Sequence, residues 1–114
     1  MPYINSKVTV KLSEENKENL KAKMGQIISD LPGKSEEWLM VSFNDGETIY
    51  FRGNKMDKAA FVDVRMFGKA DRQHKNKVAQ MLCSLLESEV DIPQENIYVT
   101  FSEVEDWGWN GELF

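Results

Sequence analysis

The segment Glu37-Trp38-Leu39-Met40-Val41-Ser42-Phe43 has a counterpart 58 positions later, Glu95-Asn96-Ile97-Tyr98-Val99-Thr100-Phe101. In both segments apolar residues recur at every second position, which is typical of a strand with one buried face. Each segment follows a stretch of helical periodicity, and each such stretch follows another alternating segment. Two β-α-β units in tandem are the economical explanation of this pattern.

The first unit is expected to begin with a strand over residues 2–10, where apolar and polar residues alternate. Ser13, followed by two glutamates, is a typical helix start. Pro32-Gly33 is expected to end this helix. The apolar stripe of the helix comprises Leu20, Met24, Ile27, Ile28 and Leu31.

A strand over residues 38–43 completes the first unit. It is followed by Asn44-Asp45-Gly46, a sequence that favours a tight turn. The chain is therefore expected to return through Thr48-Ile49-Tyr50-Phe51 as the second strand of a hairpin.

The second unit repeats this plan. Residues 60–67 alternate like a strand, Asp71 is placed to cap a helix, and residues 97–101 form the last strand. Right-handed crossovers place both helices on the same face of one sheet. We therefore predict an α+β fold in a single domain over residues 1–114, with two helices on one face of a four-stranded mixed sheet. The stripe of the second helix comprises Val78, Met81, Leu82, Leu85 and Leu86.

The sheet face opposite the helices is expected to be mixed in character. Such a face can be solvated or enclosed by symmetric copies of itself, and we favour enclosure because no further helix remains to cover it. The tail carries Trp107, Trp109 and Phe114, which is unusual for a solvated terminus. These side chains either fold back onto their own subunit or dock on a neighbour. The mixed face comprises Asn5, Lys7, Thr9, Met40, Ser42, Asp63, Arg65, Phe67, Tyr98 and Thr100.

Composition argues against several classes of protein. The net charge of −5 disfavours nucleic-acid binding, because proteins that bind nucleic acids usually present a positively charged surface to the phosphates. No apolar run approaches the roughly 20 residues of a membrane span, and no secretory signal is visible. The single cysteine, Cys83, excludes an internal disulfide framework and a multi-cysteine metal site. A cytoplasmic location is expected, with secretion that uses no signal peptide as the alternative.

Pro2 is the residue with the most distinctive chemistry. Aminopeptidases generally remove Met1 when the next residue is small, and removal would leave a secondary amine on a stiff ring. At the start of an apolar strand this amine would be partly desolvated, which lowers its pKa toward neutrality. A near-neutral pKa suits a general base. The structural alternative is a tolerated residue in a flexible terminus.

Five motifs occur here in the order that a known family shows: Pro2, Gly33-Lys34, Phe67-Gly68-Lys69, Ile97-Tyr98-Val99 and Trp107-Gly108-Trp109-Asn110. Over its whole length the chain resembles the macrophage migration inhibitory factor and D-dopachrome tautomerase family. The resemblance implies a homotrimer whose three sheets surround a central channel, with active sites between subunits. It also implies a keto–enol tautomerase, an isomerase of phenylpyruvate-type aromatic 2-oxo acids, in which Pro2 is the general base and acid.

The resemblance assigns further roles. Lys34 and the backbone N–H of Phe67 would bind the substrate carboxylate, and Tyr98 would donate its hydroxyl from a neighbouring subunit. Taken singly, each has a structural alternative: Lys34 would meet the negative end of a helix dipole, and the aromatic residues would pack in a core or an interface. An apolar pocket for the substrate ring would be lined by Tyr3, Trp38, Val104, Trp107, Trp109 and Phe114.

The chain departs from the animal members at three places. Thr100 stands where many of them have asparagine, the loop before Trp107 is shorter, and Ala59-Ala60-Phe61-Val62 replaces their Cys-x-x-Cys pair, so a thiol oxidoreductase is unsupported.

The only histidine, His74, falls on the polar first turn of a helix, which argues against a histidine triad or a metal site. No cofactor motif occurs, so no cofactor is expected.

Two other functions remain open. The protein could be a cytokine mimic or interaction protein that contacts a host receptor, with vestigial or no catalysis. It could also use the proline for a related reaction, such as decarboxylation of a dopachrome-like compound. Arg65, on the same strand as Phe67, would assist with anions or pair with Asp63.

Overall fold

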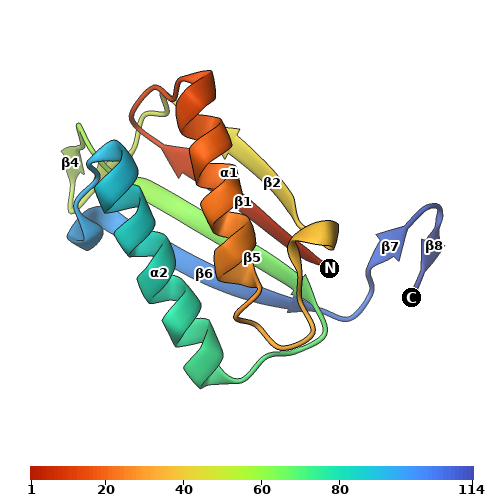
Figure 1. Cartoon of the computed structure of the whole chain (residues 1–114). Helices are drawn as coiled ribbons and strands as arrows, with labels where there is room; N and C mark the ends of the chain where they lie inside the picture. Colours follow the sequence, from red (N-terminus) through yellow and green to blue (C-terminus); the bar gives the residue numbers. More distant parts are fainter.

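In the computed structural model, which describes residues 1–114, both helices cover the same face of a four-stranded sheet (Figure 1). The strand order β2-β1-β5-β6 is formed by β1 (Pro2–Val8), β2 (Met40–Asn44), β5 (Ala60–Phe67) and β6 (Ile97–Val104). β1 and β2 are parallel, as are β5 and β6, whereas β1 and β5 run antiparallel at the centre. The predicted α+β fold, with a mixed sheet and two helices on one face, is confirmed.

Both helices begin where the sequence predicts. The Ser13 hydroxyl accepts a hydrogen bond from the Asn16 N–H at 3.0 Å. The Asp71 carboxylate accepts one from the His74 N–H at 2.8 Å. These caps satisfy backbone N–H groups that have no partner within a helix. The two helices are α1 (Glu14–Ile28) and α2 (Arg72–Val90).

α1 ends earlier than expected, at Ile28 rather than at Pro32-Gly33. The Ser29 hydroxyl donates to the Gly25 carbonyl at 3.0 Å, and so occupies an acceptor in the last turn of the helix. The Leu31 N–H then bonds to the Ile28 carbonyl, three residues back, which is the tighter pattern common at helix ends. Leu31 is still fully buried, so the apolar stripe continues beyond the helix.

The repeat covers more of the chain than the aligned segments indicate. The same offset of 58 residues relates the first residues of β1 and β5 and the two helix caps. It also relates two short 3-10 helices, η1 (Glu36–Trp38) and η2 (Gln94–Asn96). Trp38 was predicted to lie in a strand, but it lies in η1. The Leu39 N–H donates to the Glu36 carbonyl and so closes a 3-10 turn there. The second strand begins only at Met40.

The hairpin predicted between β2 and residues 48–51 is wrong. The Asp45 carboxylate accepts the Leu12 N–H at 2.8 Å, and the Gly46 N–H donates to the Val10 carbonyl at 3.0 Å. The chain after β2 is therefore held against the end of β1 and its continuation, and it does not fold back on β2. Tyr50 and Phe51, which were expected to pair with β2, instead pair with Asn54 and Lys55.

Two short hairpins stand at opposite ends of the sheet. The first, β3–β4 (Tyr50–Phe51 with Asn54–Lys55), and the second, β7–β8 (Gly108–Trp109 with Glu112–Leu113), are again 58 residues apart. Each turns through two residues of positive φ, which a two-residue turn of this hand requires. Figure 1 shows β4 at one end of the molecule and β7–β8 at the other, near the N-terminus.

The core lies between the helices and the sheet. Eighteen buried apolar side chains from both helix stripes and from the helix-facing strand positions form one cluster. Ile4 and Val64 are fully buried, whereas Met40 on the open face is 67% exposed. Ser6 is fully buried among them, and its hydroxyl has no hydrogen-bond partner. Neither helix combines the length and the apolar character that crossing a membrane requires.

Candidate functional site

A groove of about 870 Å³ lies at the end of the sheet where β1 begins. Its walls are the start of β1, η1 with the start of β2, the end of β6 and the β7–β8 hairpin. Most of the lining is hydrophobic, with few polar groups, which is typical of a site for a small apolar molecule. The lining residues are Met1, Pro2, Tyr3, Glu37, Trp38, Leu39, Met40, Arg65, Val104, Asp106, Trp107, Gly108 and Trp109.

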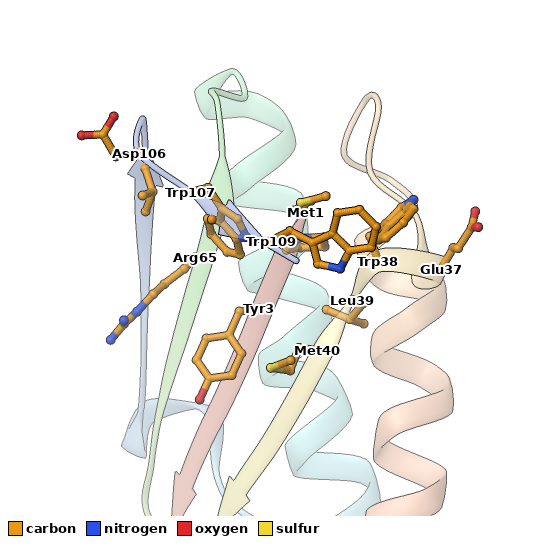
Figure 2. Close-up of a pocket in the computed structure, with 13 residues that line it drawn as sticks. Met1, Tyr3, Glu37, Trp38, Leu39, Met40, Arg65, Asp106, Trp107 and Trp109 are labelled. Atoms are coloured by element: carbon orange, nitrogen blue, oxygen red, sulfur yellow. The ribbon is translucent and has the colours of Figure 1, made fainter. Parts of the chain in front are cut away.

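Tryptophans form one wall of the groove. The rings of Trp38 and Trp109 meet edge to face, with centroids 5.2 Å apart and planes at 85°. Figure 2 shows both rings beside Met1 at the start of β1, while the carboxylates of Glu37 and Asp106 point away. Edge-to-face contact fixes the orientation of the two rings. Because Trp38 is 44% and Trp109 51% exposed, indole surface remains available to a ligand.

The chain terminus lies inside the groove. Pro2 is buried and stands opposite Met66 on β5. The Phe67 N–H donates to the Met1 carbonyl at 3.1 Å, so Met1 occupies a backbone donor beside the groove. Burial, and secondarily the positive charge of Lys34, lower the pKa of the Met1 amino group from its ordinary value of 8.0.

Three further predicted residues lie together beside the terminus. Lys34 Nζ donates to the Phe67 carbonyl at 3.0 Å. The rings of Phe67 and Phe114 are 5.3 Å apart, and the Phe114 N–H donates to the Trp107 carbonyl at 3.1 Å. Lys34 thus contacts this cluster and not the last turn of α1, which ends at Ile28. Its ammonium group has three donors, so two remain for an anion.

A hydrogen-bonded chain leads from the groove along the open face of the sheet. The Tyr3 hydroxyl lies 2.6 Å from Ser42 Oγ, which itself donates to Asn5 Oδ1 at 2.8 Å. The Ser42 hydrogen is therefore engaged, and Tyr3 is the donor of the pair. Arg65 donates to Asp63 Oδ2 at 3.0 and 3.2 Å, which confirms the pairing expected from the sequence. The Arg65 guanidinium also lies 5.9 Å from the centre of the Tyr3 ring.

Tyr98 lies far from the groove of its own chain. It stands opposite Phe61 on β5, whereas Pro2 stands opposite Met66, five residues further along that strand. At roughly 3.3 Å per residue the two sites are about 17 Å apart. Tyr98 instead contacts the rings of Phe51 and Phe61.

The fold thus gathers most, but not all, of the predicted site. Lys34, Phe67 and Phe114 do not line the groove but form a cluster that the Phe67 N–H joins to Met1, and Tyr98 does not reach the groove. Met40 and Arg65, neither of which was predicted to line the pocket, do so because both stand opposite Tyr3 on the neighbouring strands. The alternation of the strands placed Met40 and Arg65 on the open face of the sheet, but only the register, which the sequence does not fix, brings them beside Tyr3. The predicted residues that line the groove are Pro2, Tyr3, Trp38, Val104, Trp107 and Trp109.

His74, Glu103 and Cys83, which lie outside the groove, show no arrangement suited to catalysis. His74 Nδ1 lies 2.6 Å from Asp71 Oδ1 on the exposed start of α2. Glu103 accepts the Ala70 N–H at 2.9 Å, and this bond is the main cause of its lowered pKa. Burial raises the pKa of the Cys83 thiol, which makes it a poor nucleophile. No group of three or more histidine, cysteine, aspartate or glutamate side chains is placed to hold a metal ion. The terminal amine is the group in the groove best placed for proton transfer.

Known proteins share this architecture. MIF2 of Leishmania major is 32% identical, and its crystal structure matches with a TM-score of 0.93 over 100% of this chain and 97% of that one. A macrophage migration inhibitory factor homologue of Brugia malayi is 26% identical over 116 residues, which cover 100% of this chain and 99% of the relative. The structure of Pt0534 inactivated by 2-oxo-3-pentynoate has the same fold, with 16% identity and a TM-score of 0.83 over 96% of this chain and 93% of that one.

A family model described as macrophage migration inhibitory factor (MIF) matches residues 1–114. The match includes every residue of the groove and both β-α-β units. The chain therefore belongs to the macrophage migration inhibitory factor family, within the tautomerase superfamily.

Proposed function

We propose that the processed protein is a cofactor-free keto–enol tautomerase of phenylpyruvate-type aromatic 2-oxo acids, with the Pro2 amine as general base and acid. The observation that carries this proposal is the environment of the terminus, an amine in an apolar groove whose pKa is lowered by burial and by Lys34. Removal of Met1 would move the terminus one residue inward, to the buried Pro2. A pKa nearer neutrality lets one group take up a proton and return it.

Removal of Met1 would also free a carboxylate site. The Phe67 N–H, now bonded to the Met1 carbonyl, would become available beside the Lys34 ammonium group. A backbone N–H and a lysine together make charge-assisted hydrogen bonds to a carboxylate. The inactivation of a protein of the same fold by 2-oxo-3-pentynoate supports the choice of a 2-oxo acid.

The tryptophan wall supports an aromatic substrate. With the carboxylate at Lys34 and the ring against Trp38 and Trp109, substrate C3 would lie next to the Pro2 nitrogen. A proton would pass from C3 to that nitrogen while the C2 oxygen gains a proton from a donor, which gives the enol. In the reverse direction Pro2 would return a proton to C3. The substrate gains and loses no electrons overall, so the step calls for no redox group.

The same proposal includes a homotrimer with sites between subunits. β2 and β6 are unpaired edge strands, and the open face of the sheet carries exposed side chains such as Met40 and Tyr98. Exposed aromatic groups stand at both ends of the sheet, Trp38 and Trp109 at one and Tyr98 at the other. Head-to-tail association of unlike ends closes into a ring when the rotation allows it. The Tyr98 hydroxyl of one subunit would then reach the groove of the next.

The central test compares phenylpyruvate tautomerisation by wild-type protein and Pro2→Gly. Glycine is also small, so Met1 should be removed from both proteins, which mass spectrometry of the intact chains verifies. We expect kcat/KM to fall on the order of 10²-fold or more. The rates are compared at a temperature at which both proteins are fully folded, because loss of the buried proline ring lowers stability. Equal rates would refute the proline mechanism. A MIF-like interaction protein with vestigial or no catalysis would then be the hypothesis to pursue, by receptor binding.

A mixing experiment tests the shared site. In trimers refolded from equal amounts of Pro2→Gly and Tyr98→Phe chains, about a quarter of the interfaces would combine an intact Pro2 with an intact Tyr98. The mixture should therefore be more active than either variant refolded alone. Activity equal to the mean of the two separate samples would exclude a contribution of Tyr98 from a neighbouring subunit.

A further inference from the structure

Tyr98 is an exposed residue whose ring is nevertheless held on two sides. Its ring meets that of Phe51 at 5.1 Å and 79°, and that of Phe61 at 6.5 Å and 87°. Its side chain is 59% exposed, and its hydroxyl makes no hydrogen bond within the chain. Edge-to-face contacts of this kind fix ring orientation. The protomer thus presents a tyrosine hydroxyl that is oriented but unused.

Phe51 belongs to the β3–β4 hairpin, which is fastened to the segment that leads into β6. Arg52 Nη2 donates to the Glu95 carbonyl at 3.5 Å, and Asn96 Nδ2 donates to the Lys58 carbonyl at 3.0 Å. The Arg52 guanidinium also lies 4.8 Å from the centre of the Phe51 ring. One hydrogen bond from the hairpin and one to the segment that follows it therefore link this region to η2, and Phe51 contacts Tyr98 immediately beyond η2.

The internal repeat gives this contact a counterpart in the groove. Phe51 corresponds to Trp109, because β3 and β7 are separated by the repeat offset, and Tyr98 corresponds in the same way to Met40. Trp109 and Met40 both line the groove at the other end of the sheet. The β3–β4 hairpin places the Phe51 ring against Tyr98 near the start of β6, and the β7–β8 hairpin places the Trp109 ring against Trp38 of η1, just before β2. The Trp109 ring lines the groove, whereas the Phe51 ring at the opposite end contacts Tyr98.

We propose that Phe51 is a positioning residue that fixes the Tyr98 ring, so that its hydroxyl is directed at a substrate bound in the groove of a neighbouring subunit. This inference rests on the proposed tautomerase and its shared site. A hydrogen bond to substrate requires the hydroxyl within a few tenths of an ångström of its place, which a surface tyrosine free to change rotamer does not maintain. Phe51 acts only through Tyr98 and touches no reacting atom.

The test is a double-mutant cycle in the assembled protein, with trimer formation verified by light scattering. Tyr98→Phe removes the hydroxyl and should lower kcat/KM about 10-fold. Phe51→Leu keeps an apolar side chain but loses the ring, and should lower it about 3-fold. Phe51→Tyr keeps a ring at this position and should restore the wild-type value. Phe51→Leu should have no further effect in the Tyr98→Phe background, because the group on which it acts is absent.

Losses that multiply in the double variant would show that Phe51 supports the fold and would overturn the inference. A second measurement separates this inference from the proposed function. In protein labelled on its tyrosine rings, NMR should show a loss of Tyr98 ring order in Phe51→Leu and its recovery in Phe51→Tyr. Unchanged ring order overturns the positioning role whatever the activity. Ring order could also be lost in Phe51→Leu while wild type and Pro2→Gly are equally active. That result would refute the proline mechanism, and the positioning of Tyr98 by Phe51 would then have no role in catalysis.

Discussion

Ser6→Ala should stabilise the protein, because the Ser6 hydroxyl is fully buried without a hydrogen-bond partner. An unsatisfied buried hydroxyl costs roughly 1–3 kcal/mol relative to a solvated one. Alanine removes that cost and gives up only the packing of one oxygen atom, which is worth about 0.1–0.2 kcal/mol for each neighbouring atom that it touches. The net expectation is a gain of about 1 kcal/mol in the free energy of unfolding. Ser6 faces the helices, so enclosure of the open face by other subunits leaves its environment unchanged.

The assay is urea denaturation at one fixed protomer concentration, since oligomer stability depends on concentration. A gain of 1 kcal/mol moves the midpoint upward by about 0.5 M. Ser42→Ala is the matched control, because Ser42 stands next to β1 but its hydroxyl bonds to both Tyr3 and Asn5. That variant should lose about 0.5–1 kcal/mol. A Ser6→Ala variant that is less stable than wild type would show that the hydroxyl is satisfied, and the reasoning from its burial would be wrong.

Three further outcomes follow from the structure. Lys34→Met should raise KM for phenylpyruvate roughly 10- to 100-fold through loss of a charge-assisted bond, whereas the exposed Lys69→Met should not. The Leu12 N–H is the main cause of the lowered pKa of Asp45, so this group stabilises the fold above pH 3.8 and the contribution is lost as the pH falls through the folded-state pKa. Thermal unfolding from pH 6 to pH 2.5 should therefore show a steeper acid loss for wild type than for Asp45→Asn. Gly25→Ala should add up to about 1 kcal/mol in a urea titration, because only a flexible, exposed carboxylate side chain must move; a loss would mean that the close approach is required.

The layered fold was predictable because its signals are local and repeated. Ser13 and Asp71 cap helices through bonds to residues only three positions away. The hairpin at Asn44-Asp45-Gly46 failed for the opposite reason. Its turn chemistry is favourable, but the Asp45 carboxylate bonds to Leu12, 33 residues away in sequence. This contact between residues distant in sequence decides the path of the chain after β2, and it cannot be predicted from the residues of the turn alone.

The groove was only partly predictable, because its residues come from strands whose register the sequence does not fix. Pro2 and Trp109 were assigned through resemblance to a family, whereas composition and spacing alone favoured a plain terminus and interface packing. Met40 and Arg65 enter the groove as the neighbours of Tyr3 on β2 and β5. The antiparallel pairing of β1 with β5 also separates Tyr98 from Pro2. A sequence motif does not contain this information, because it does not specify how strands pair.

The repeat and that antiparallel pairing together explain why one chain carries only one candidate active site. Each unit builds the same end structure, a strand start, a 3-10 helix and a hairpin, and the two copies lie at opposite ends of the sheet. Ala60 occupies the place of Pro2 in the second unit, and its nitrogen is an internal amide that cannot act as a base. Within the main chain only the terminus carries an amine, so the second end has no equivalent of the Pro2 nitrogen and presents aromatic groups such as Tyr98 instead. In the proposed trimer, subunits joined unlike end to unlike end would bring the two kinds of end together at every interface, and the Tyr98 hydroxyl of one subunit would reach the Pro2 of the next.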